Sequence, residues 1–176
     1  PLSVFYNKDK NIVVIFILVP SAGIEWEIAD IVKKIYSKMD AEQVLAMDST
    51  VINSKDKLYY LSNYKKSDPK LDSFAKQAKN SVIAGITSAL LLEEMNVLCL
   101  LSNVMSKQGD EEKPKQETPA TTAVTLIDGL NSYLDLDIKT DNLKKLGHEM
   151  EKQLKGFIDD LSKAKSQSTK PKAYIG

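Results

Sequence analysis

The stretch Ile12-Val-Val-Ile-Phe-Ile-Leu-Val19 decides the fold class, because it is a continuous apolar run rich in β-branched residues. A strand with one face in water alternates apolar and polar residues, whereas a strand covered on both faces does not. We therefore predict a central strand over residues 12–19, paired in parallel with its neighbours. The polar segment Asn7–Asn11 predicts a turn before this strand, and Pro20–Gly23 ends it.

Helix and strand patterns alternate along the next eighty residues. Apolar residues recur at spacings of three and four from Ile24 to Met39, which predicts a helix with one face against a sheet. A second helix is predicted from Thr87 to Glu94. Strands are predicted at residues 43–47, 57–64, 82–86 and 97–101. This alternation is typical of an α/β fold with a mainly parallel sheet flanked by helices.

Two helices are predicted near the C-terminus. Thr118 and Thr140 are capping residues, Pro119 suits a first helical position, and apolar stripes follow both caps. The second of these helices is predicted to run to Leu161.

The domain organisation follows from the polar segments. Residues 106–118 contain no large apolar residue and predict a mobile polar loop. We expect that loop to lie inside a single α/β domain spanning residues 1–161. Residues 162–176 carry four Lys and no acid, and predict a flexible basic tail that ends in a Tyr-containing peptide.

Composition excludes several classes of protein. The 24 basic residues balance 24 acidic ones, and all of the basic residues are Lys. Nucleic-acid recognition usually needs a basic face and Arg side chains, so no nucleic-acid partner is expected. The longest apolar run is far shorter than the roughly 20 residues of a membrane span, so no membrane partner is expected.

The scarcity of Cys and His limits metal and disulfide chemistry. Cys99 is the only cysteine and His148 the only histidine, which excludes an intrachain disulfide and the usual multi-Cys and His-pair metal motifs. Cys99 lies within an apolar run and is expected to be a buried structural residue. His148 is expected on a helix surface. We predict no cofactor, and the unpaired thiol favours a reducing, cytoplasmic location.

Few segments suggest a small-molecule site. The turn Gly85-Ile-Thr-Ser88 leads from a predicted strand into a helix, where free N–H groups can hold an anion. Capping of that helix by Thr87 and Ser88 is the favoured interpretation, since the segment lacks the P-loop pattern. Glu25, Glu27 and Asp30 fall in the first turns of a predicted helix and match its dipole.

The tail is the most informative feature of the sequence. Tyr174 and Ile175 follow a long polar stretch with nothing nearby to pack against. They can fold back on the domain, or they can form a peptide whose terminal carboxylate a partner captures. The sequence leaves both interpretations open.

Four segments in this order resemble the proteasome assembly chaperone family, in particular its archaeal members. They are the strand and helix of Ile12–Val32, the small-residue junction of Val82–Leu92, the strand Val97–Leu101 and the helices that begin at Thr118. Together the resemblance covers about residues 11–160.

The resemblance implies a non-enzymatic protein that binds the α subunits of the proteasome core particle and associates with itself or with a related chaperone subunit. Many family members end in a hydrophobic–Tyr–any tripeptide that inserts between α subunits. Ala173, Tyr174 and Ile175 match that pattern, and Gly176 adds one residue after it. These four residues are therefore the expected partner-binding residues, with no catalytic or metal-binding residue.

Two other functions remain open at this stage. The same α/β layout hosts nucleoside phosphorylase-like or other small-molecule-binding enzymes, in which Gly85–Ser88 would hold phosphate. Alternatively, the chain is the inactive half of a hetero-complex.

Overall fold

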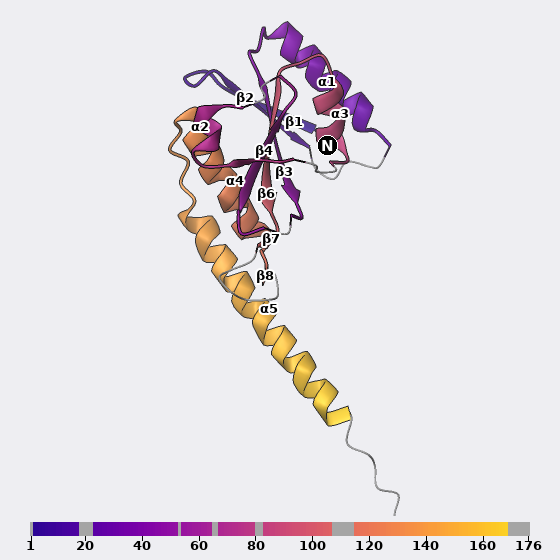
Figure 1. Ribbon diagram of the computed structural model, residues 1–176, viewed down its shortest axis with the longest axis vertical. Coiled ribbons are helices and arrows are strands. Elements are labelled where there is room, and N and C mark those ends of the chain that lie inside the picture. Colours follow the sequence, from indigo (N-terminus) through magenta and orange to yellow (C-terminus); the bar gives the residue numbers. More distant parts are fainter. Residues whose placement is uncertain are drawn as a thin grey trace, which may run out of the picture. The chain divides into compact units, whose positions relative to one another are not determined.

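The computed structural model describes residues 2–17, 23–52, 54–64, 67–79, 83–106 and 115–168 (Figure 1). Its elements, in chain order, are β1 (Leu2–Asn7), β2 (Ile12–Ile17), α1 (Glu25–Lys38), β3 (Val44–Thr50), β4 (Leu58–Ser62), α2 (Pro69–Asp72), β5 (Lys76–Gln77), α3 (Ile86–Leu92), β6 (Val97–Asn103), β7 (Met105–Ser106), β8 (Lys115–Gln116), α4 (Pro119–Leu134) and α5 (Asp141–Ser168).

The predicted α/β class is confirmed, with a mixed sheet, flanking helices and the two expected C-terminal helices. One sheet has the strand order β3-β6-β4-β5, and β4 pairs with β5 in parallel. The chain divides into two compact units. Residues 1–46, 62–66 and 79–99 form unit 1, and residues 47–61, 67–78 and 100–176 form unit 2.

The first strand differs from its prediction. β2 is a strand, but it pairs antiparallel with β1 in a separate two-stranded sheet, with Phe5 opposite Val14. The turn between them closes because Asn7 accepts a hydrogen bond from the Lys10 amide at 3.0 Å and Asn11 has a φ of +51°. So short a connection permits only antiparallel pairing, because parallel strands need a long crossover. The prediction of a central parallel strand was therefore wrong.

The strand predicted at residues 82–86 is also wrong over its described part. Residues 83–85 form no strand, and α3 begins directly at Ile86. Gly85 has a φ of +75°, a left-handed conformation that breaks an extended backbone and that glycine adopts readily.

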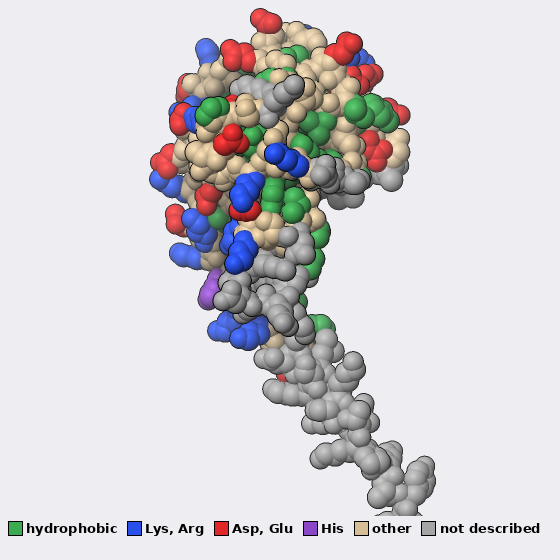
Figure 2. All heavy atoms as spheres, viewed as in Figure 1, with side chains coloured by type: hydrophobic (Ala, Val, Ile, Leu, Met, Phe, Trp, Pro, Cys, Tyr) green, Lys and Arg blue, Asp and Glu red, His purple; other side chains and the backbone are tan. Residues whose placement is uncertain are grey.

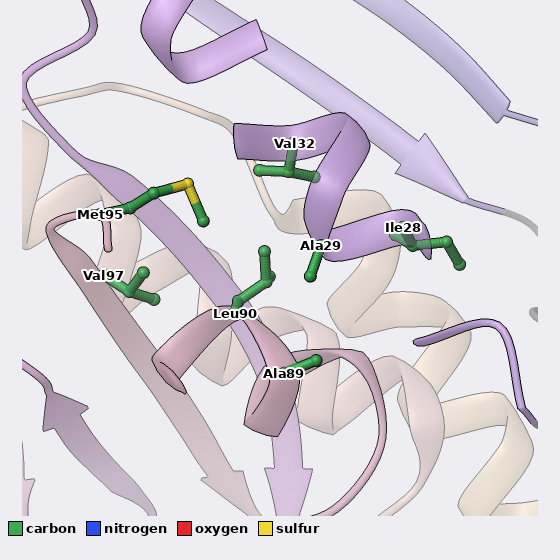
Figure 3. Packing of buried hydrophobic residues seen from close by; sticks show 7 residues of the cluster. All are labelled: Ile28, Ala29, Val32, Ala89, Leu90, Met95 and Val97. Atoms are coloured by element: carbon green, nitrogen blue, oxygen red, sulfur yellow. The ribbon is translucent and has the colours of Figure 1, made fainter. Parts of the chain in front are cut away.

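The core of unit 1 lies between two helices and neighbouring strands. Its buried residues come from α1, α3, β6 and the connection before β6, as Figure 3 shows: Ile28, Ala29, Val32, Ala89, Leu90, Met95 and Val97. Ile15 and Ile17 of β2 pack against this cluster from the periphery. The apolar stripe predicted on the first helix therefore meets the core through Ile28 and Val32.

Asn63 fixes the backbone around this core. Its amide nitrogen donates to the carbonyls of Leu91 and Met95, at 3.1 and 2.9 Å, and its oxygen accepts from the amide of Val97 at 2.9 Å. One side chain thus ties the end of α3 to the start of β6.

In unit 2, α4 packs on the strands and α5 packs on α4. Gly129 of α4 lies so close to the strands that a Cβ there would be 2.5 Å from Leu58 and 3.7 Å from Leu100. Thr118 caps α4 as predicted, accepting from the amide of Thr121 at 3.2 Å. Asp68 caps α2 in the same way, ahead of Pro69 at the first helical position.

Two boundaries differ from their predictions. α5 continues to Ser168, beyond Leu161, because the residues that follow include helix formers such as Ala, Lys and Gln. Strand pairing also enters the predicted polar loop, since Ser106 of β7 lies opposite Lys115 of β8. Within the described ranges, no helix combines the length and apolar composition that a membrane crossing requires.

Candidate protein-docking surfaces

The long helix α5 runs antiparallel to α4. Just before α5 starts, the Thr140 hydroxyl donates to the Asp128 carboxylate at 3.4 Å, in the second half of α4. Further along α5, Gly147 faces Thr121, near the start of α4. A helix of 28 residues is about 42 Å long, and the 16 residues of α4 span about 24 Å. The second half of α5 therefore continues past the start of α4, as Figure 1 shows.

Apolar side chains on this projecting half are exposed. Leu154 is 48% exposed and Phe157 is 62% exposed. The tail that follows includes the predicted partner-binding residues Ala173, Tyr174, Ile175 and Gly176, which lie outside the described residues.

A second exposed apolar surface was not found from the sequence. The β1–β2 hairpin of unit 1, which we call the apolar hairpin (Leu2–Ile17), leaves six large side chains 41–61% exposed: Leu2, Val4, Phe5, Tyr6, Val14 and Phe16. The available signal was a turn flanked by two apolar segments, which is typical of a hairpin.

The Gly85–Ser88 turn uses its serine hydroxyl within the turn itself. Ser88 donates its hydroxyl hydrogen to the Gly85 carbonyl at 2.6 Å, so that hydrogen is already used within the turn. No side chain caps α3, and Thr87 is buried. The N-cap position of α3 is taken by Gly85, so neither Thr87 nor Ser88 occupies it.

The remaining candidate residues occupy structural positions. Cys99 is fully buried in β6, and His148 is exposed on α5, both as predicted. Glu25 and Glu27 lie in the first turn of α1, where they match the helix dipole, and Glu25 accepts from the Gly23 amide at 2.8 Å. Within the described ranges, no group of His, Cys, Asp and Glu is placed to hold a metal ion.

An open pocket of about 470 Å³ lies in unit 2, between the β4 and β5 segments and α4. Its charged groups already have partners. Lys76 lies 2.8 Å from Asp56 and, through this hydrogen bond, holds the pKa of that carboxyl below its usual value. Asp72 accepts from the hydroxyl of Tyr60 at 2.6 Å. The pocket thus offers no unpaired charge at these positions to bind a ligand.

Tyr60 has the largest titration shift that the structure resolves. Its side chain is fully buried, and this burial raises its pKa to about 12, with the hydrogen bond to Asp72 adding to the effect. The pair links β4 and α2.

On the face that Figure 2 presents, charge does not single out one area. Lys and Asp or Glu side chains are both spread over the face that Figure 2 presents, with hydrophobic side chains among them. The surfaces that stand out are therefore apolar: the projecting half of α5 and the apolar hairpin. Both suit contact with another protein.

Comparisons with known proteins agree with the fold. The chain is similar to Pyrococcus furiosus PbaA, described as an archaeal homologue of proteasome-assembly chaperone, with 21% identity and a TM-score of 0.68 over 96% of this chain and 70% of PbaA. It is also similar to Pyrococcus furiosus PbaB, described as an archaeal proteasome activator, with 15% identity and a TM-score of 0.58 over 82% of this chain and 63% of PbaB.

A Mycobacterium tuberculosis proteasome-assembly chaperone homologue gives 12% identity and a TM-score of 0.57 over 88% of this chain and 66% of that protein. A search of curated proteins gives no match. The model of the PAC2 family matches residues 1–158. The resemblance to proteasome assembly chaperones is confirmed by these matches, and the chain belongs to the PAC2 family.

Proposed function

We propose that this chain is a non-enzymatic proteasome assembly chaperone or activator that binds the α ring of the core particle. It acts in the cytoplasm as an oligomer and contacts the ring partly through its basic tail, residues 162–176. The observation that carries the proposal is the family match over residues 1–158, together with structural relatives that are described as chaperone homologues and an activator.

The geometry of α5 supports a role for the tail. The helix projects past α4 and includes the first residues of the tail, up to Ser168, so the rest of the tail would start some distance from the strands of unit 2. Ala173, Tyr174 and Ile175 would then insert between neighbouring α subunits, with Tyr174 as the main anchor.

The energetics of such a contact favour an oligomer. Burying one Tyr side chain contributes about 1.5–3 kcal/mol, which is too little by itself for stable binding. Several tails presented together to a ring of similar pockets bind more tightly, because the first contact raises the effective concentration of the others.

The proposal is tested by co-purification with the core particle of the organism that encodes the chain. We expect the full chain to retain the core particle, and a chain ending at Pro171 to retain at least about tenfold less. Tyr174→Ala should resemble the truncation. A chain with residues 162–176 shuffled is the matched control, since it keeps tail length and charge.

The outcomes separate the two parts of the proposal. Equal binding by the full and truncated chains would rule out the tail contact while keeping the partner. Absence of binding by every variant would overturn the assignment to the core particle. If the shuffled tail binds as well as the native tail, the Lys charge rather than Tyr174 makes the contact.

A further inference from the structure

Three lysines on α5 form a row on the side of the helix away from α4. An α-helix turns about 100° per residue, so Lys145, Lys152 and Lys155 fall within an arc of about 80° and span about 15 Å along the axis. Gly147 faces Thr121 of α4 and so marks the packed side of the helix. The three lysines point about 80–160° away from Gly147, and all three are exposed. We call Lys145, Lys152 and Lys155 the lysine row.

The lysine row has no acidic partner among the described residues. Between Lys145 and Lys155 the helix contains two acids, Glu149 and Glu151, and each falls about 40° outside the arc, one on either side. Other lysines of unit 2 form ion pairs of 2.7–2.8 Å with Asp side chains: Lys70 with Asp135, Lys76 with Asp56 and Lys139 with Asp137. The row therefore differs from these lysines in pairing rather than in exposure.

The row is a local feature, because the chain as a whole carries no net charge. Both signs also mix on the face that Figure 2 presents. Exposed charges are screened beyond about 8 Å at physiological ionic strength, so a short row acts on a surface that it nearly touches. Its complement is an acidic protein surface. A nucleic acid is a poorer match, since nucleic-acid sites usually combine a strongly basic face with Arg, which this chain lacks.

The row lies within reach of the proposed tail contact. From Lys155 the helix continues to Ser168, a rise of about 20 Å. The six residues from there to Tyr174 span at most about 21 Å when fully extended. A partner that holds Tyr174 therefore lies within about 40 Å of Lys155, close to the diameter of a small domain. One partner can contact both the row and the tail.

From this arrangement we infer that the lysine row is a docking surface for an acidic surface of the core particle. The inference rests on the proposed function and adds a second contact to it, made by side chains of α5. The row speeds the encounter and the tail then holds the complex. Exposed charges act mainly on the association rate, whereas buried contacts act mainly on the dissociation rate.

Charge reversal on the full chain tests the inference. We expect the triple variant Lys145→Glu, Lys152→Glu, Lys155→Glu to bind the core particle with an association rate constant at least about tenfold lower than that of the wild type in about 50 mM salt. The dissociation rate constant should change much less. Surface plasmon resonance with immobilised core particle measures both rate constants.

A matched variant controls for total charge. Lys10, Lys55 and Lys79 are exposed and lie in connections between strands and helices, away from α5. Their replacement by Glu changes the net charge by the same amount, and we expect it to change the association rate constant by less than about twofold. A shared loss in both triple variants would assign the effect to net charge and overturn the inference.

Charge removal separates docking from a change in the helix. Gln has nearly the helix propensity of Lys, so replacing the lysine row with Gln keeps α5 and removes three charges. We expect an intermediate loss of association rate, with unchanged helix content by circular dichroism. The wild-type association rate should also fall more steeply with added salt than that of the Gln variant. Equal salt dependence in the two proteins would overturn the inference.

The remaining outcomes distinguish the inference from the proposed function. A wild-type association rate in the Glu variant of the row would overturn the inference and leave core-particle binding intact. No binding by the wild-type chain would overturn both. If the Glu variant binds the core particle normally but loses a retention on duplex DNA that the wild type shows, the row is a nucleic-acid contact and the inference is overturned.

Discussion

Strands β2 and β6 are nearly equal in sequence character but differ in their surroundings. β2 reads Ile-Val-Val-Ile-Phe-Ile, and β6 begins Val-Leu-Cys-Leu-Leu. All of β6 is buried, because it lies between β3 and β4 in the sheet. Among the residues that the structure describes, β2 has only β1 as a strand neighbour, and Val14 and Phe16 are half-exposed. A continuous apolar run therefore predicts a strand, but it does not show which residues bury the side chains of that strand.

Truncating one side chain in each strand should give the largest difference in the free energy of unfolding. Leu100→Ala in β6 should lower the free energy of unfolding by about 2–5 kcal/mol, since Leu100 is fully buried and a cavity would remain. Phe16→Ala in β2 should cost about 1 kcal/mol or less in the isolated chain. Urea unfolding at concentrations where the chain is monomeric measures both. Equal costs would mean that β2 is covered within one chain.

Gly-to-Ala substitutions compare a crowded position beside the sheet with an open position on α5. Gly129→Ala places a Cβ against Leu58, beside Leu100 of β6, and should cost about 1–3 kcal/mol through overpacking. Gly156→Ala is the matched control, because nothing lies within 4 Å of its added Cβ. That change should stabilise α5 by up to about 1 kcal/mol. Thermal unfolding compares the pair, and a stabilising Gly129→Ala would contradict the tight packing of α4.

Two tyrosines, one buried and one exposed, allow the pH dependence of stability to be compared between the two regions. Tyr60 in β4 is buried and its pKa is raised to about 12, so the folded state keeps a proton that the unfolded state loses near pH 10. The contribution of Tyr60 to stability is complete below pH 10 and is lost between pH 10 and 12. Tyr60→Phe should remove this pH dependence and cost about 1 kcal/mol at neutral pH, through the lost hydrogen bond to Asp72.

Tyr6→Phe is the control, since Tyr6 is 54% exposed in the hairpin. Among the described residues its hydroxyl donates one long hydrogen bond of 3.4 Å to the side-chain oxygen of Asn11, so we expect almost no change in stability at neutral pH. Denaturant unfolding at neutral pH and at intervals from pH 9 to 12 measures both variants against the wild type. An unchanged alkaline loss in Tyr60→Phe would assign that loss to other groups.

Patterns that depend on near neighbours in the chain were predicted well. The cap at Thr118 and the helix from Ile24 to Met39 are present with small shifts in their bounds, because capping and helical periodicity are local. The position of Cys99 was also predicted, since an apolar run as continuous as Val97–Leu101 suits an inner strand.

Features that depend on distant residues were not predicted. Asn63 and Asn103 look like ordinary polar residues in the sequence, yet each fixes segments far away in the chain. Asn103 is almost fully buried, accepts from the Ile52 amide at 3.0 Å and donates to the carbonyls of Ile52 and Asp56. The strand predicted at residues 82–86 failed because the positive φ of Gly85 is not visible in its apolar neighbours.

For the candidate site, the sequence by itself showed which catalytic and metal-binding motifs the chain lacks. It also showed which segments resemble a known family. An Arg-free chain with one Cys and one His excludes many metal and phosphate motifs by composition alone. Only the tertiary structure decided which apolar residues stay exposed. Burial depends on what packs against a strand or helix, so β6 became a core strand, while the apolar hairpin and the projecting half of α5 kept exposed apolar side chains.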